Sequence, residues 1–149
     1  MEVLLNKISD SGLDASSVTG EEAIIFWNHV RSHIATTNEE RAQTYIISAE
    51  YRSELNQFQA CIDELRLALD QLKLPNDAET ILAVKNSLSE HLVDIGDYTA
   101  ALTEYSSSSA IAVEHGFIDE YALSILGMGN LCDAYGDHSR ALRYYQKID

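Results

Sequence analysis

The stretch DIGDYTAALTEY, residues 94–105, decides the fold because it recurs at a fixed spacing along the chain. Forty residues later it returns as AYGDHSRALRYY, residues 134–145, and forty residues earlier as the weaker copy ELNQFQACIDEL, residues 54–65. Each copy reads as the end of one helix, a tight turn and the start of another. A period of 20–50 residues is typical of proteins built from stacked repeats. The sequence therefore predicts a helical-repeat architecture.

The bulk composition favours one compact, all-helical domain. The chain has 149 residues, of which 46% are hydrophobic, with one Pro and seven Gly. A chain of this length buries about 68–70% of its unfolded surface when it folds as one domain. We expect a single helical-repeat domain over 1–149, with a degenerate helix pair at 1–38 and repeats at 39–76, 77–116 and 117–149. The last repeat is truncated inside a core-facing helix, so we expect the chain to be the N-terminal part of a longer protein.

The charge excludes some classes of partner. The formal net charge is −14, from 24 acidic and 10 basic residues. Such a chain repels a phosphate backbone and an anionic membrane surface, so we expect neither nucleic acid nor membrane as a partner. The first ten residues have too short an apolar run for a signal peptide, and no run approaches the roughly 20 residues of a membrane span. Two cysteines without metal-ligand spacing favour a reducing, cytoplasmic location.

Capping and turn residues predict the helix boundaries. The segments Thr19-Gly20-Glu21-Glu22 and Thr37-Asn38-Glu39-Glu40 both read as capping boxes. Asp77 is placed to cap a helix that starts after the only proline, and Gly116 is placed to end one. We expect helices at about 2–10, from the first capping box to about 34, and at 39–55, 58–72, 78–95, 99–114, 118–135 and from 138 onward.

The copies resemble the tetratricopeptide repeat, a helix-turn-helix unit. Its turn glycine and acidic residue, following aromatic, alanine and second aromatic are matched here by Gly96-Asp97-Tyr98, Ala101 and Tyr105. The last copy matches with Gly136-Asp137, Ala141 and Tyr145, but His138 replaces the aromatic. The first copy is degenerate, with Asn56, Phe58, Cys61 and Leu65. The small residue in the middle of each first helix is matched by Ala49, Ser89 and Gly129.

Two features depart from that family. Its usual period is about 34 residues, whereas this one is forty, and the proline that commonly ends a unit occurs only once. HEAT and armadillo repeats have similar periods but lack a glycine-aspartate-tyrosine turn, so they are the second choice. The longer unit is similar to tetratricopeptide repeats of bacterial signalling proteins, which precede an output domain such as a helix-turn-helix or a GGDEF diguanylate cyclase.

The resemblance implies an all-α, right-handed superhelix of about four antiparallel helix pairs. In that family the first helix of each pair lines a concave groove that binds peptides or protein segments. Aligned by the forty-residue period, the groove positions are Gln43, Ile46, Glu50 and Glu54 in the first copy. They are Asn86, Glu90 and Asp94 in the second, and Leu126, Asn130 and Asp133 in the third.

These groove positions predict a basic or amphipathic partner segment. Some members of the family hold a C-terminal carboxylate with basic residues on this face, but here carboxylates stand in their place, so that kind of clamp is disfavoured. The competing interpretation is that a protein of charge −14 is acidic on most faces. An evenly acidic surface would favour that interpretation.

Two other sets of residues have side chains of the kind found in metal or catalytic sites. His29 and His33 share a helical face with the spacing of a metal pair, but no third ligand stands nearby, so no metal is predicted. Glu90, His91 and Asp94 look like an acid–base set, although all three lie on one helix. We therefore predict no catalytic residue, no cofactor and no enzyme activity.

Three more features are expected to be structural, and a fourth, Gly127, has two alternative uses. Cys61 occupies a small-residue position and Cys132 an inward one, so both are expected to be buried, inert thiols. The serine run 106–109 favours close packing against a neighbouring helix. Gly127 faces the groove, where it either opens room for a ligand or permits a bend.

The sequence thus predicts a non-enzymatic protein-interaction module, acting as the sensory or regulatory N-terminal domain of a bacterial signalling protein. Two alternatives stay open. One is a structural dimerisation module that uses its terminal helices, where Tyr144, Tyr145 and Ile148 would otherwise be exposed. The other is a small-ligand sensor fused to an output domain.

Overall fold

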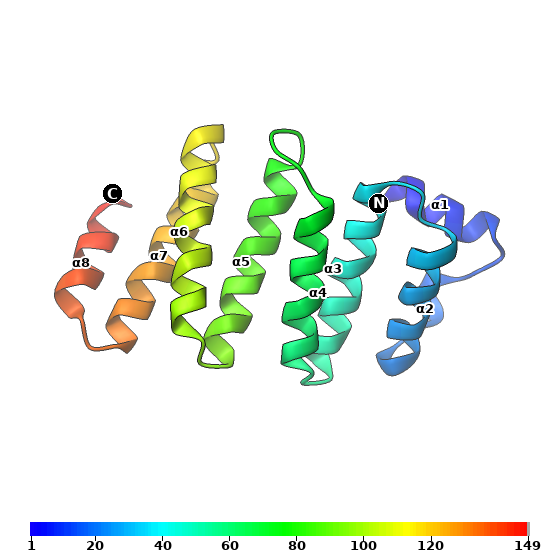
Figure 1. Cartoon of the computed structure of the whole chain (residues 1–149), viewed down its shortest axis with the longest axis horizontal. Helices are drawn as coiled ribbons and strands as arrows, with labels where there is room; N and C mark the ends of the chain where they lie inside the picture. Colours follow the sequence, from blue (N-terminus) through cyan, green and yellow to red (C-terminus); the bar gives the residue numbers. More distant parts are fainter. Residues whose placement is uncertain (149) are drawn as a thin grey trace. The chain divides into compact units, whose positions relative to one another are not determined.

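The structure is a computed structural model that describes residues 1–148, and these residues form helices without any strand (Figure 1). The helices are α1 (Glu2–Asp10), α2 (Gly20–His33), α3 (Asn38–Glu54), α4 (Phe58–Gln71), α5 (Ala78–Asp94), α6 (Tyr98–His115), α7 (Ile118–Ala134) and α8 (His138–Gln146), with a 3₁₀ turn at Ala15–Ser17. The predicted boundaries agree with these to within one residue or so. The all-α fold is confirmed.

The chain divides into two compact units, Met1–Leu72 and Lys73–Asp149. In the first unit, α2 packs on α3 and α3 on α4. Its core at the N-terminal end gathers apolar side chains of α1 and α2, among them Leu4, Ile8, Trp27 and Val30. In the second unit α5, α6, α7 and α8 pack each on the next, and α5 also contacts α7.

The turn of each repeat uses a left-handed residue. Gly96 and Gly136 both have a φ of 82°, and Asn56 takes the same role with a φ of 60°. The following aspartates cap the next helix, because Asp97 accepts from the Ala100 N–H at 3.3 Å and Asp137 from the Arg140 N–H at 3.2 Å. The forty-residue repeat in the sequence therefore corresponds to a repeated backbone geometry at the turn.

Two of the predicted helix ends are made as expected and two are not. The Thr37–Glu40 capping box is present in both directions, and Gly116 ends α6 with a φ of 78°. The Thr19 box is wrong, because the Thr19 side chain makes no capping bond. Gly20 follows it with a φ of 58°, which turns the first residue of α2 out of helical geometry.

The predicted cap at Asp77 is also wrong. Its side chain makes no cap of α5 and instead accepts from the Lys73 backbone N–H at 2.8 Å. The Asp77 backbone N–H closes the same short loop by donating to the Lys73 carbonyl at 3.0 Å. A local loop contact therefore competes successfully with the helix terminus for this carboxylate.

Candidate functional site

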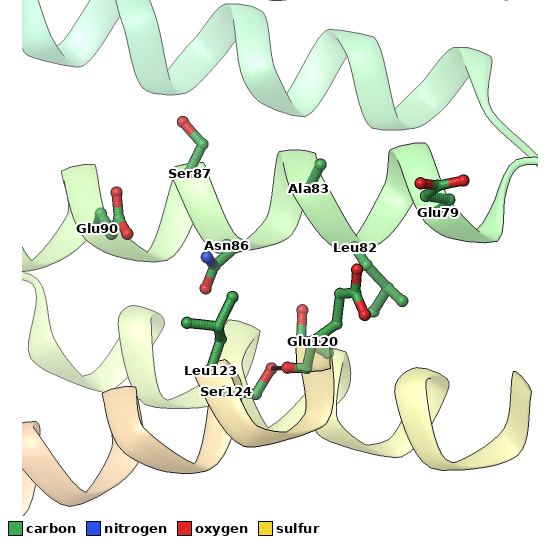
Figure 2. Close-up of a pocket in the computed structure, with 10 residues that line it drawn as sticks. Glu79, Leu82, Ala83, Asn86, Ser87, Glu90, Glu120, Leu123 and Ser124 are labelled. Atoms are coloured by element: carbon green, nitrogen blue, oxygen red, sulfur yellow. Dashed lines mark hydrogen bonds between the residues drawn. The ribbon is translucent and has the colours of Figure 1, made fainter. Parts of the chain in front are cut away.

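A hollow of about 330 Å³ lies within the second unit, between the facing sides of α5 and α7 (Figure 2). We call it the α5–α7 hollow. Helix α5 contributes Glu79, Leu82, Asn86 and Glu90, while α7 contributes Glu120, Leu123 and Ser124, and α6 adds Ser108. Figure 2 shows Asn86, Leu123 and Glu120 in the space between the two helices, with Glu79 and Glu90 toward opposite ends of it.

Helical spacing explains why these side chains share one face. On α5, Glu79, Ala83, Asn86 and Glu90 follow at intervals of four, three and four, which keeps them on one side of an α-helix. The buried side of the same helix carries Leu88 and other apolar residues. The packing of α5 onto α6 thus leaves the polar stripe facing outward, beside α7.

A second hollow of about 230 Å³ adjoins the first through Glu90, which lines both. We call it the Tyr105 hollow, and Asp94, Gly127 and Asn130 also line it. Tyr105 is only 7% exposed. Burial, and then the negative charges of Glu90 and Asp94, raise the pKa of Tyr105. The two hollows together form a continuous acidic strip along one face of α5.

The acidic side chains of this strip have no basic partner. Glu79, Glu90, Asp94 and Glu120 make no ion pair with any residue of the part of the chain that the structure describes. The ion pairs of this unit join the Lys85 Nζ to Glu104 at 3.0 Å and the His138 Nδ1 to Asp133 at 2.9 Å, and none of these residues lines the hollows. The strip therefore presents uncompensated negative charge to whatever enters it.

Four of the six groove positions predicted for this unit line the hollows, namely Asn86, Glu90, Asp94 and Asn130. Leu126 does not line them and is 42% exposed. Asp133 turns instead toward α8, where it accepts from the Tyr145 hydroxyl at 2.8 Å and lies 2.9 Å from the His138 Nδ1. Hydrogen bonds from His138 and then Tyr145 lower the pKa of Asp133.

The four predicted groove positions of the first unit lie on α3 and do not share one hollow. Gln43 lines a separate space of about 270 Å³ beside Lys7, Thr37 and Glu40. Ile46 is half-buried, while Glu50 and Glu54 are exposed. Burial and then the charge of Glu54 raise the pKa of Glu50. Within this unit, these positions do not form an acidic strip like that of α5.

A buried polar network in the first unit escaped the sequence interpretation. Ser48 donates to Glu64 at 2.6 Å, and the Arg52 Nε donates to the other oxygen of Glu64 at 2.8 Å. Arg31 donates to Ser48 at 3.1 Å and covers the Tyr45 ring at 3.7 Å. The available signal was helical spacing, because Glu64 falls among the buried positions of α4.

A second such contact joins α1 to α3. Glu40 Oε1 accepts from the Lys7 ammonium at 2.8 Å and from the backbone N–H groups of Thr36 and Thr37 at 3.1 and 3.2 Å. Burial opposes ionisation, but these hydrogen bonds outweigh it and lower the pKa of Glu40 to about 2. This carboxylate is structural, since it ties the start of α3 to α1.

The ring of Tyr105 packs against Gly127. A Cβ at Gly127 would overlap the Tyr105 ring, just as one at Gly129 would overlap the Tyr145 ring. The Tyr105 ring therefore lies where a side chain at Gly127 would be, and Gly127 also lines the Tyr105 hollow, so the two predicted uses of this glycine stay open. Gly129 fits the expected close approach of paired helices.

The remaining candidates are two histidines, two cysteines and the serine run. Within residues 1–148 no three His, Cys, Asp or Glu residues are placed to hold a metal. His29 and His33 are exposed, with ring centroids 4.6 Å apart. Cys61 and Cys132 are buried as expected, and burial, followed by the charge of Glu64, raises the pKa of Cys61 to about 11. Of the serine run, only Ser108 is buried.

Comparison with known proteins supports the fold. The structure is similar to the crystal structure of MamA, with a TM-score of 0.67 and 21% sequence identity, over 99% of this chain and 75% of that one. The chain therefore has a tetratricopeptide-like, all-α repeat fold. No family model matches the sequence, and no curated protein matches it. Among the described residues, no helix is long and apolar enough to cross a membrane.

Proposed function

We propose that this chain is a protein-interaction module that binds a basic or amphipathic peptide segment in the α5–α7 and Tyr105 hollows. The observation that carries the proposal is the set of four carboxylates facing these hollows without an intramolecular ion pair. They are Glu79, Glu90, Asp94 and Glu120. A cationic segment would supply positive charges to pair with these carboxylates.

The dimensions suit a short segment. The α5 face from Glu79 to Asp94 extends about 22 Å, at about 1.5 Å per helical residue. A helical peptide of about 15 residues has the same length. Leu82 and Leu123 offer apolar contact between the charged positions. An amphipathic segment can therefore place its apolar side chains at the centre and its basic ones along the carboxylates.

Electrostatic attraction of this kind accelerates encounter and selects the partner more than it adds affinity. Screening by salt weakens it, because the carboxylates at the ends of the strip are exposed. The same strip repels acidic segments. We expect a free C-terminal carboxylate to be a poor ligand here for the same reason.

Binding is tested with fluorescently labelled, capped peptides of about 15 residues that contain Leu, Ala and Arg in an amphipathic helical pattern. Fluorescence anisotropy on the full chain should show saturable binding that weakens as salt rises. A matched peptide with Glu in place of every Arg should not bind. Glu90→Gln should raise the Kd about fivefold, because Glu90 lines both hollows.

A matched control separates the site from general acidity. Glu114 is exposed on α6 and lines neither hollow, so Glu114→Gln removes the same charge elsewhere in the unit. If both variants weaken binding equally, the peptide is attracted to the acidic surface as a whole. That result would remove the proposed site.

The wider role follows the resemblance. We propose a non-enzymatic, cytoplasmic regulatory module at the N-terminal side of a bacterial signalling protein, with the repeats divided at 1–38, 39–76, 77–116 and 117–149. Dimerisation through the terminal helices is the second candidate, because Leu142 of α8 and Ile148, which follows α8, are 57% and 39% exposed. Light scattering during size exclusion distinguishes the two, since a concentration-independent monomer excludes the dimer.

A further inference from the structure

Ser108 is a buried hydroxyl without a partner. It lines the α5–α7 hollow, is 1% exposed, and its Oγ makes no hydrogen bond within the described residues. Other buried serines of this unit are satisfied by their own helix. The Ser89 Oγ donates to the Lys85 carbonyl at 2.7 Å, and the Ser124 Oγ donates to the Glu120 carbonyl at 2.9 Å.

A buried polar group without a partner is unfavourable and rare in folded proteins. A satisfied alternative was available, since the back-bonding seen at Ser89 and Ser124 is open to any helical serine. The hydroxyl of Ser108 has instead been left as a free donor and acceptor at a hollow with acidic walls. A polar group that enters the hollow would give the Ser108 hydroxyl the hydrogen-bond partner that it lacks among the described residues.

We propose that the α5–α7 hollow is a pocket for one arginine side chain of the partner segment, with the Ser108 Oγ accepting a hydrogen bond from the guanidinium. The inference rests on the proposed function and names the residue of the partner that the site selects. It also assigns to Ser108 a part in specificity that its position inside a helical serine run did not reveal.

The chemistry of the walls favours a guanidinium. Arginine carries five N–H donors in a planar fork and no acceptor. The Glu120 carboxylate, the Asn86 amide oxygen and the Ser108 hydroxyl offer acceptors from three different helices. Lysine brings only three donors from a single point, so it satisfies such a spread set less well.

The apolar walls suit the rest of the side chain. Leu82 and Leu123 line the hollow from opposite helices, where they can cover the methylene stem of an arginine. An uncharged apolar side chain would leave the carboxylate, amide and hydroxyl oxygens without donors. The site should therefore discriminate by charge and by hydrogen-bond geometry together.

The test uses the Leu/Ala/Arg peptide described above and two further versions, in which the central Arg is replaced by Lys or by its neutral isostere citrulline. Each is titrated by anisotropy against the full chain and against Ser108→Ala and Ser108→Thr. We expect Ser108→Ala to raise the Kd of the Arg peptide about tenfold and to leave that of the citrulline peptide nearly unchanged. Ser108→Thr keeps the hydroxyl and should keep most of the affinity. Circular dichroism checks that each variant is folded.

The outcomes separate this inference from the proposal on which it rests. If Glu90→Gln weakens binding but Ser108→Ala does not, the pocket is wrong and the peptide site stands. If the unmodified chain binds the Lys and Arg peptides equally, the selectivity for arginine is wrong, whatever the variants do. If the Arg peptide does not bind the unmodified chain at all, both proposals fail.

Discussion

The hydroxyl of Ser108 illustrates how a single residue can oppose stability in the free protein. Because it is buried and unpartnered, replacing it with alanine removes an unsatisfied polar group. We expect Ser108→Ala to raise the free energy of unfolding by about 1 kcal/mol, measured by urea denaturation of the unliganded chain. A gain in stability together with a loss of peptide affinity is the signature of a binding residue.

A fall in stability would have a different meaning. It would show that the Ser108 hydroxyl makes a favourable contact in the free protein. Ser124→Ala is the matched control, because the Ser124 hydroxyl is already satisfied by the Glu120 carbonyl. That variant should have little effect on unfolding.

The turn residues give a second prediction at this scale. Asn56 has a φ of 60° where the later copies have glycine. Left-handed backbone costs a side-chain-bearing residue more than it costs glycine. Asn56→Gly should therefore raise the unfolding free energy by about 0.5 kcal/mol, and Gly96→Ala should lower it by about 1–2 kcal/mol. Relative to the unmodified chain, the urea midpoint should shift upward in Asn56→Gly and downward in Gly96→Ala. Shifts in the same direction would contradict this account of the turn.

Glu40 gives a prediction about pH. Its pKa is lowered to about 2 in the folded chain, against 4.5 for an unperturbed glutamate. A depressed folded-state pKa contributes stability that is complete above about pH 4.5 and is lost as the pH falls toward 2. Lys7→Gln should lower the unfolding free energy by about 1 kcal/mol at pH 7, because it removes the charged donor.

The difference in unfolding free energy between Lys7→Gln and the unmodified chain should then become smaller as the pH falls from about 4.5 toward 2. Urea unfolding at several pH values measures it. A difference that stays constant over that interval would mean that the Lys7–Glu40 contact does not set the acid response of this unit.

At the scale of elements, helix α7 is shaped by two aromatic side chains from its neighbours. Tyr105 fills the place of a Cβ at Gly127, and Tyr145 does so at Gly129. Tyr105 is 7% exposed, whereas Tyr145 is partly exposed and its hydroxyl donates to Asn130 and Asp133. We expect Gly127→Ala to destabilise by about 1–3 kcal/mol from overpacking, reduced by up to about 1 kcal/mol of helix propensity.

Gly129→Ala should cost less, because water can replace the exposed hydrogen bonds of the Tyr145 hydroxyl when the ring shifts, and the gain in helix propensity offsets the remaining strain. Thermal melts of the two variants provide the comparison. If Gly129→Ala is the more damaging substitution, the exposed position of Tyr145 does not relieve the overlap. The account of α7 packing would then be wrong.

The helices themselves were predictable because their ends are written in local sequence. Glycine at a left-handed position and a threonine-glutamate capping box act over four or five residues, so no tertiary information is needed. The caps predicted at Thr19 and Asp77 are absent for local reasons. Gly20, the residue after Thr19, has a left-handed backbone, and the Asp77 side chain accepts from the Lys73 backbone N–H. Each of these features decides where one side chain goes without moving the helix.

Contacts between helices were much harder to predict. The ring of Tyr105 lies against Gly127 of the next helix, and Arg31, Ser48 and Glu64 meet from three helices. A period shows that positions are equivalent, but it does not show which equivalent side chains turn inward. Asp133 is an example, because its partner Tyr145 draws it toward α8 and away from the hollow side.

At the scale of the whole molecule, net charge does not locate the site. Each compact unit carries 12 acidic and five basic residues, so both are equally acidic by composition. What differs is where the paired carboxylates lie, since Glu40 and Glu64 of the first unit are held by Lys7 and Arg52, whereas Lys85 of the second unit holds Glu104, which lies outside the hollows. The four carboxylates that line the hollows of the second unit make no ion pair within residues 1–148; they are Glu79, Glu90, Asp94 and Glu120.

The sequence therefore predicted the repeat and the face of α5 that lines a hollow, but not the hollow or the unpaired hydroxyl within it. Four predicted positions fall in the hollows because the period identifies the first helix of each pair correctly. Ser108 comes from α6, a second helix, which the groove positions of the resemblance do not include. Identifying such a position requires the tertiary structure.

The most direct measurement is a chemical-shift map of the isotope-labelled full chain during titration with the Leu/Ala/Arg peptide. We expect the largest shifts at amides of α5 and α7 that flank the two hollows, Asn86, Glu90, Leu123 and Asn130 among them. The α3 carboxylates Glu50 and Glu54 should shift little and serve as the internal control. Shifts spread evenly over the acidic residues of both units, or no saturable shift at all, would contradict the account.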